Sequence, residues 1–233
     1  MSHPGIGLRR HGLSIVELLV GVTIGLFILA GATVVMSTQL GDNRRMLLEA
    51  QVQQDLRAVL DIVVRDVRRA GYWAQAWNNV WQPDAAQAMR NPYNNLTTET
   101  DSVLYDRSQD ESGAALGTDN NVVDDDETVG FRHNADARTV EMRIGNSWQT
   151  LTDPAVLSVT QFSIAVRSRS VPLPCGALCP PGPTLASNVL CLQVRDVVVT
   201  IVANAVHDSS VSRSASSDVR LRNDVLVEQA APC

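Results

Sequence analysis

The pattern of hydrophobic and polar positions divides the chain into three parts. No charged residue occurs from Leu18 to Met36, and this run of nineteen residues is long enough to cross a bilayer as a helix. Further along, apolar residues recur every three or four positions, which predicts an amphipathic helix lying on a core. These positions are Leu48, Val52, Leu56, Val59, Leu60, Val63 and Val67. Beyond residue 100, apolar residues alternate with polar ones, which predicts strands.

The first two parts predict one long helix from Leu13 to about Ala70. Gly71 is a natural C-terminal stop, and Arg68 and Arg69 are favourably placed at the negative end of the helix. Gly41 lies between the apolar and the amphipathic halves, and we expect a bend or local melting of the helix there. The sequence therefore predicts a helix with a membrane half and a half that packs on a soluble core.

The remaining residues predict an antiparallel β-sheet, so the fold class is α+β, a long N-terminal helix packed on a sheet. Residues 72–100 are rich in Trp, Asn and Pro and predict an irregular loop packed by aromatic side chains, in preference to an exposed assembly contact or a carbohydrate platform. Gly145-Asn146 predicts a tight hairpin turn. The Val- and Ile-rich segment 190–206 predicts a central strand. The predicted strands are 101–106, 128–133, 138–144, 147–151, 156–166, 190–206 and 218–226.

Composition excludes several functions. The formal net charge of −6 argues against a nucleic-acid-binding surface, because phosphate neutralisation needs clustered positive charge. The sequence has no nucleophile elbow, phosphate-binding loop, dinucleotide fingerprint or H-E-x-x-H helix, and its four histidines are scattered. We therefore predict that the chain is not an enzyme and uses no cofactor.

Two groups of residues suggest metal sites. The acidic connection before the strand at 128 suggests calcium, but it lacks the spacing and the glycine of an EF-hand loop, so a solvated, mobile loop is the preferred interpretation. Its acidic residues are Asp110, Glu111, Asp119, Asp124, Asp125, Asp126 and Glu127.

The four cysteines raise a choice between zinc and disulfides. They lack the paired spacing of a zinc site, and only His133 and His207 occur beyond the N-terminal residues, so we predict no metal. The Pro-rich segment 172–183 predicts a stapled loop, in which Cys179 bonds Cys175 or Cys191, while Cys233 holds the tail. Disulfides fit an oxidising periplasm.

The N-terminal residues carry a family resemblance. Arg9, Arg10 and His11 precede the run Gly12-Leu-Ser-Ile-Val-Glu17, which resembles the cleavage and methylation site of type IV prepilins and type II secretion pseudopilins. The resemblance implies that a prepilin peptidase cuts after Gly12 and that Leu13 becomes the N-methylated first residue. It also implies that Glu17 pairs with the N-terminal amine of a neighbouring subunit. Gly21 and Gly25 match the small-residue motif of packed membrane helices.

A second stretch resembles one type of pilin within this class. The run Arg65-Asp-Val-Arg-Arg-Ala-Gly-Tyr-Trp73 resembles the helix exit of PilW-type minor pilins, and Arg222-Asn223 resembles their closing Arg-Asn pair. The domains implied are a leader over 1–12, a transmembrane helix over 13–40, an amphipathic helix over 41–71 and a periplasmic head over 72–233. The implied protein is held in the inner membrane by a single pass, with its N-terminus cytoplasmic.

The resemblance implies a minor pilin that primes type IV pilus assembly at or near the tip and supports twitching motility and adhesion. Its implied partners are other minor pilins, the major pilin, prepilin peptidase, the inner-membrane assembly platform and a tip adhesin. Two alternatives remain open on the sequence alone. One is a GspJ-like minor pseudopilin of type II secretion, and the other is a membrane-anchored periplasmic binding protein that never polymerises.

Overall fold

A computed structural model of the chain describes residues 14–79, 91–109, 119–172 and 188–230. The chain divides into two compact units, Met1–Leu47 and Leu48–Cys233. The first unit holds the apolar half of one long helix. The second unit, called the head below, holds the amphipathic half of that helix and all the strands.

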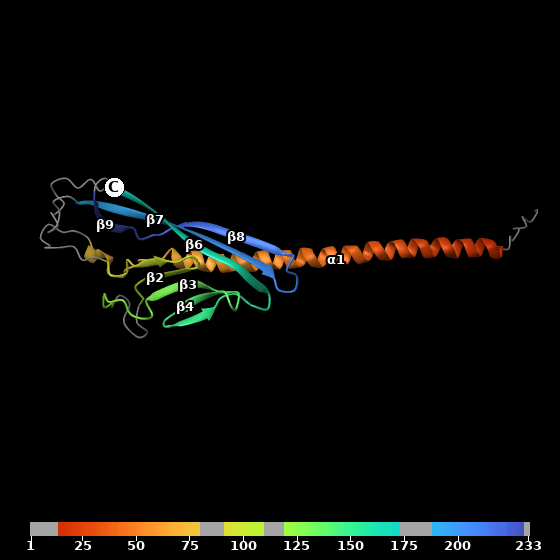
Figure 1. The fold of residues 1–233 in the computed structure, drawn as a ribbon, viewed down its shortest axis with the longest axis horizontal. Coiled ribbons are helices and arrows are strands. Elements are labelled where there is room, and N and C mark those ends of the chain that lie inside the picture. The colour runs from red at the N-terminus through yellow and green to blue at the C-terminus, as the bar shows by residue number, and fades with distance from the viewer. Residues whose placement is uncertain (1–13, 80–90, 110–118, 173–187, 231–233) are drawn as a thin grey trace, which may run out of the picture. The chain divides into compact units, whose positions relative to one another are not determined.

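The helix α1, Ile15–Val67, is 53 residues long (Figure 1). Its extent confirms the predicted helix to within a few residues at either end. It continues through Gly41 without a break, so the predicted local melting is wrong. Glycine weakens a helix by only about 1 kcal/mol, and a helix of 53 residues tolerates that cost.

The head contains two antiparallel sheets instead of the single predicted one. The first has the order β1-β2-β3-β4-β5, and each strand pairs with its neighbour in sequence. The strands are β1 (Leu96–Thr98), β2 (Ser102–Asp106), β3 (Thr128–Asn134), β4 (Thr139–Ile144) and β5 (Ser147–Thr150). The predicted turn joins β4 to β5, where Gly145 has a φ of 59° and Ile144 pairs with Ser147.

The second sheet is built around β7, as the run of Val and Ile predicts. β7 pairs with β6 along one edge, and with β8 and β9 in turn along the other. A strand with neighbours on both edges and packed faces favours continuous β-branched residues. The four strands are β6 (Leu157–Pro172), β7 (Asn188–Ala205), β8 (Ser212–Arg220) and β9 (Val225–Ala230).

One hydrophobic core joins the amphipathic half of α1 to both sheets. In the view of Figure 1 the two sheets lie on either side of this half of the helix. All the predicted apolar positions except the half-buried Leu48 are buried: Val52, Leu56, Val59, Leu60, Val63 and Val67. They form one cluster with buried side chains such as Phe131 of the first sheet and Ile201 of the second. The head is thus a helix packed between two sheets, with one side of the helix left exposed.

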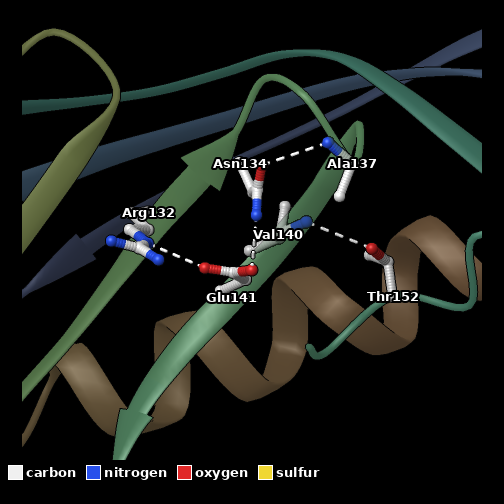
Figure 2. A network of polar contacts seen from close by, with 6 residues as sticks. All are labelled: Arg132, Asn134, Ala137, Val140, Glu141 and Thr152. Carbon is white, nitrogen blue, oxygen red and sulfur yellow. Dashed lines mark hydrogen bonds and ion pairs between the residues drawn. The ribbon is translucent and has the colours of Figure 1, made fainter. Parts of the chain in front are cut away.

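A polar network fixes the β3–β4 hairpin (Figure 2). Glu141 accepts hydrogen bonds from Arg132 Nε and Asn134 Nδ2, each at 2.7 Å. Asn134 Oδ1 accepts a bond from the backbone N–H of Ala137, which closes the turn. The hydrogen bond from Asn134, together with the hydrogen bond and charge of Arg132, lowers the pKa of Glu141, because these effects outweigh burial, which raises it.

The elements that the sequence analysis missed are short or polar. The 3₁₀ helix η1 (Ala76–Asn79) and β1 lie inside the predicted irregular loop. Most of strand β8 is missed because most of its residues are polar, and the predicted strand 218–226 instead spans the turn between β8 and β9. Within the predicted aromatic loop, Trp73 and Tyr93 are buried as predicted, whereas Trp77 is 62% exposed; Trp81 lies outside the described residues.

Candidate functional site

The apolar half of α1 presents large hydrophobic side chains with no cover in the described structure. Phe27 is 81% exposed, and Ile15, Leu18, Leu26 and Val34 are each at least 60% exposed. Within the residues that the structure describes, α1 is the helix long and apolar enough to cross a membrane. A contiguous exposed apolar surface of this extent marks an interaction with lipid or with another protein.

Three threonines of this half satisfy their hydroxyl hydrogen bonds within the helix. The hydroxyls of Thr23, Thr33 and Thr38 donate to backbone carbonyls three or four residues earlier, at 2.8–3.1 Å. Such internal bonds allow a hydroxyl to lie in an apolar medium at low cost. The surface of the apolar half is therefore effectively apolar at these threonines.

Glu17 is the exception, because it is the one ionisable side chain between Ile15 and Gly41. It lies exposed in the first turn of α1. Ser14 caps this turn, since its Oγ accepts a hydrogen bond from the backbone N–H of Val16 at 3.3 Å. The position of Glu17 near the positive end of the helix dipole stabilises its charge in part. Among the described residues no donor lies within hydrogen-bond or ion-pair distance of the carboxylate.

Gly21 and Gly25 follow Glu17 at intervals of four residues, which places all three on neighbouring turns of one side of α1. A Cβ built on either glycine would meet nothing within 4 Å among the described residues. That side is therefore open, and the backbone of a second helix can approach it closely. The arrangement offers a carboxylate and a shallow groove to the same approaching helix.

Two predicted site residues, Gly12 and Leu13, lie outside the described residues. So do Cys175, Cys179 and Cys233. Cys191 lies in β7, where it is buried and disulfide-bonded, so it has no thiolate to offer zinc. The pairing of the cysteines stays a prediction.

The turn that follows α1 is anchored by a segment that is distant in sequence, Arg222-Asn223. Gly71 ends the turn after α1 with a φ of 73°, a conformation that favours glycine. The backbone N–H of Arg222 donates to the Arg68 carbonyl at 3.2 Å, and Asn223 Nδ2 donates to the Ala70 carbonyl at 3.0 Å. The helix exit and the Arg-Asn pair that carry the narrower resemblance therefore contact each other directly.

A buried arginine that the sequence analysis did not single out connects this anchor to β7. Arg195 is 6% exposed, and its guanidinium donates to the carbonyls of Asn223 at 3.2 Å and Asn94 at 3.4 Å. Burial lowers its pKa, while the Asp224 carboxylate opposes that shift. The signal in the sequence was the charged pair Arg195-Asp196 inside a central strand rich in Val and Ile, because a charged residue is rarely buried there without partners.

A second buried network ties the helix exit to the first sheet. The Tyr105 hydroxyl donates to Asp66 Oδ2 at 2.6 Å, and Arg107 Nη2 lies 3.6 Å from Asp66 Oδ1. Burial, and then the Asp66 carboxylate, raise the pKa of Tyr105 well above its ordinary value, so the phenol stays a donor. Both sheets thus hold the last turns of α1.

The described acidic residues of the connection before β3 hold the connection and its neighbours by hydrogen bonds. Asp119 and Glu127 are buried, so the predicted solvated loop is wrong for these two residues. Asp119 Oδ1 accepts bonds from the Tyr93 hydroxyl and the Asn121 backbone N–H, each at 2.7 Å. Glu127 accepts the backbone N–H groups of Gln109 and Asp124, each at 3.0 Å. Across the described part of the chain, no group of three or more His, Cys, Asp or Glu residues is placed to hold a metal ion; Asp110 and Glu111 lie outside that part.

Comparison with known proteins gives one match. The family described as prepilin peptidase-dependent protein B matches residues 45–221, about three quarters of the chain. The matched region holds the amphipathic half of α1 and most of the head, and it excludes the N-terminal run that carries the first resemblance. No curated protein and no solved structure matches significantly.

Proposed function

Because the chain belongs to the prepilin peptidase-dependent protein B family, we propose that it is a minor pilin that primes assembly of a type IV pilus at or near the tip. The observation that carries the proposal is the family match through the head, in a chain whose N-terminal run independently resembles a prepilin cleavage site. We further propose that prepilin peptidase removes residues 1–12 and that Leu13 is N-methylated. The proposal gives the chain no catalytic role.

The mechanism follows from the apolar half of α1. A carboxylate at the centre of a bilayer costs roughly 2.5–3.5 kcal/mol and less near its edge, so Glu17 favours any state in which it has a cationic partner. Cleavage after Gly12 creates a new amine on every subunit. Pairing of Glu17 with that amine on a neighbour, beside the open glycines, couples subunit docking to removal of the leader.

The anchored helix exit gives the head its role in this mechanism. The first sheet contacts the last turn of α1 at Asp66, and the turn between β8 and β9 contacts the residues just after the helix, Arg68 and Ala70. The head therefore stays fixed to the amphipathic half of the helix while the apolar half exchanges lipid for other subunits. We propose that the surface of the head selects its neighbours among the other minor pilins and the major pilin.

The proposal is tested with Glu17→Gln, with Asp42→Asn as the matched control that removes another exposed carboxylate of α1. We expect Glu17→Gln to lower the amount of the protein in sheared surface pili by at least about tenfold, the loss of one favourable ion pair in an apolar medium. Cellular protein levels should stay equal. Incorporation of Glu17→Gln at the level of Asp42→Asn would contradict the assembly mechanism.

A deletion of the gene decides between pilus and secretion system. We expect loss of surface pili and of twitching, with protein secretion intact. Intact pili with loss of secreted enzymes would assign the chain to the type II pseudopilins instead. Absence of the wild-type protein from both filaments would favour a membrane-anchored protein that never polymerises.

A further inference from the structure

A pocket of the head lies beside the end of α1 and is lined mainly by arginine. Its volume is about 370 Å³, and its lining residues are Asp61, Val64, Arg65, Arg68, Arg69 and Arg222. All six belong to the same compact unit. None of the roles described above uses the side chains of Arg65, Arg68 or Arg222, so the function of this pocket is open.

The fold brings these arginines together from two segments. Asp61, Arg65 and Arg68 are spaced by four and three residues, so they lie along one exposed side of α1. Arg222 comes from the turn between β8 and β9, and its backbone N–H bonds the Arg68 carbonyl at 3.2 Å. The bond fixes Arg222 against the helix, and the cationic wall therefore does not depend on a mobile segment.

The charges of this pocket are unbalanced. Four guanidinium groups face a single carboxylate, Asp61. Arg69 has a partner in Asp66, with 3.9 Å between Nη1 and Oδ1. Within the described part of the chain, no carboxylate lies within 4.0 Å of the guanidinium groups of Arg65, Arg68 or Arg222. The negative end of the α1 dipole favours Arg65 and Arg68 but gives no bidentate acceptor for their planar forks.

We propose that this pocket binds a carboxylate-rich segment of an adjoining protein subunit. Arginine forks pair with carboxylates through two parallel hydrogen bonds, which gives both affinity and orientation. The volume lies at the lower end of ligand pockets, roughly 300–1,000 Å³, and suits a few side chains. The half-buried Val64 adds an apolar contact for the stem of a glutamate.

The surroundings favour a short acidic peptide over a long polyanion. The chain carries a formal net charge of −6, so a nucleic acid or an anionic bilayer is repelled by most of the surface. Asp61 at the pocket disfavours a continuous run of phosphates in the same way. A peptide of a few acidic residues meets the arginines without covering the acidic remainder.

This inference goes beyond the proposed function, because it concerns the head alone and requires neither cleavage nor Glu17. A chain that never enters a filament would still present the same pocket, and the hexaglutamate peptide below tests the pocket without a filament. If the pocket does not bind an acidic segment, the proposed pilin function is unaffected. If the chain is not a pilin, the proposed binding by the pocket is unaffected.

The test measures binding of a fluorescent hexaglutamate peptide to the full chain in neutral detergent at low ionic strength, by fluorescence anisotropy. Hexaglutamine is the uncharged control peptide. The Arg65→Gln/Arg68→Gln variant should weaken hexaglutamate binding by at least about tenfold, since a hydrogen bond between charged groups contributes roughly that factor or more. Arg222→Gln, which leaves α1 unchanged, should weaken it several-fold.

The matched control is Arg167→Gln/Arg169→Gln, which removes the same charge from exposed positions of β6. It should change the affinity less than about twofold. An equal loss in both double variants would show unspecific charge attraction and would overturn the proposal. So would the absence of binding to the wild-type chain, or tighter binding of single-stranded DNA or of phosphatidylglycerol vesicles that needs the same arginines. Unfolding curves of every variant establish that the head is intact.

Discussion

The two halves of α1 share one backbone conformation and differ in almost everything else. In the amphipathic half Leu56 is fully buried, whereas Leu26 in the apolar half is 61% exposed. The charged groups differ in the same way. Arg195, which holds the end of the amphipathic half, is surrounded by carbonyl acceptors of its own chain, whereas Glu17 lies exposed on the apolar half.

This difference indicates which contacts stabilise each half of α1. The amphipathic half is completed by its own sheets, and a change there should unfold the head. The apolar half is completed by other molecules, lipid or neighbouring helices, and a change there should alter assembly while the head stays folded. Each of the following predictions tests whether the head is stabilised by its own contacts and the apolar half by other molecules.

The largest effect is expected for Leu56→Ala compared with Leu26→Ala. Leu56→Ala creates a cavity between α1 and the sheets and should lower the free energy of unfolding of the head by about 2–5 kcal/mol. Leu26→Ala should change it by less than about 0.5 kcal/mol. Urea unfolding of the full chain in neutral detergent, followed by tryptophan fluorescence, measures both. Equal effects of the two substitutions would contradict the claim that the two halves of α1 are stabilised by different contacts.

The next effect is expected for Arg195→Met, which keeps much of the side-chain volume and removes the charge. The carbonyls of Asn94 and Asn223 lose their donor, and the neighbouring Asp224 loses a compensating charge. We expect a loss of about 2–4 kcal/mol in the same unfolding experiment. Arg169→Met on the exposed side of β6 is the control and should have almost no effect. A stable Arg195→Met head would mean that the anchor is dispensable.

The smallest effect concerns pH and Glu141. Its pKa is lower in the folded head than in the unfolded chain, so its contribution to stability is fully present above the unfolded value of about 4.3. That contribution disappears as the pH falls through the lower folded pKa. The difference in unfolding free energy between the wild type and Glu141→Gln should therefore shrink from pH 7 to pH 3. A difference that stays constant would show that the Arg132 and Asn134 contacts do not depend on the charge.

The elements that the sequence predicted are those with a strong local pattern. The stripe from Val52 to Val67, the Gly145-Asn146 turn and the Val-rich β7 each carry their signal within a few residues. Strand β8 carries none, because its serines lie at an edge where packing selects little. The break predicted at Gly41 is wrong because a single glycine costs a long helix only about 1 kcal/mol.

The site was predictable only where its residues are adjacent in the chain. Glu17, Gly21 and Gly25 follow one another along a single helix. The anchor of the helix end instead joins Ala70 to Asn223, and Arg195 to Asn94, across separations of 153 and 101 residues. The sequence marked the exit and the Arg-Asn pair as related stretches, but their contact depends on how the two sheets pack on α1.

The proposed mechanism depends most directly on cleavage after Gly12 and methylation of Leu13. Intact and tandem mass spectrometry of the protein purified from membranes of a host with a working prepilin peptidase tests it. We predict a mature chain that begins with N-methylated Leu13 and lacks residues 1–12. A purified protein that keeps those twelve residues in such a host would contradict the central claim.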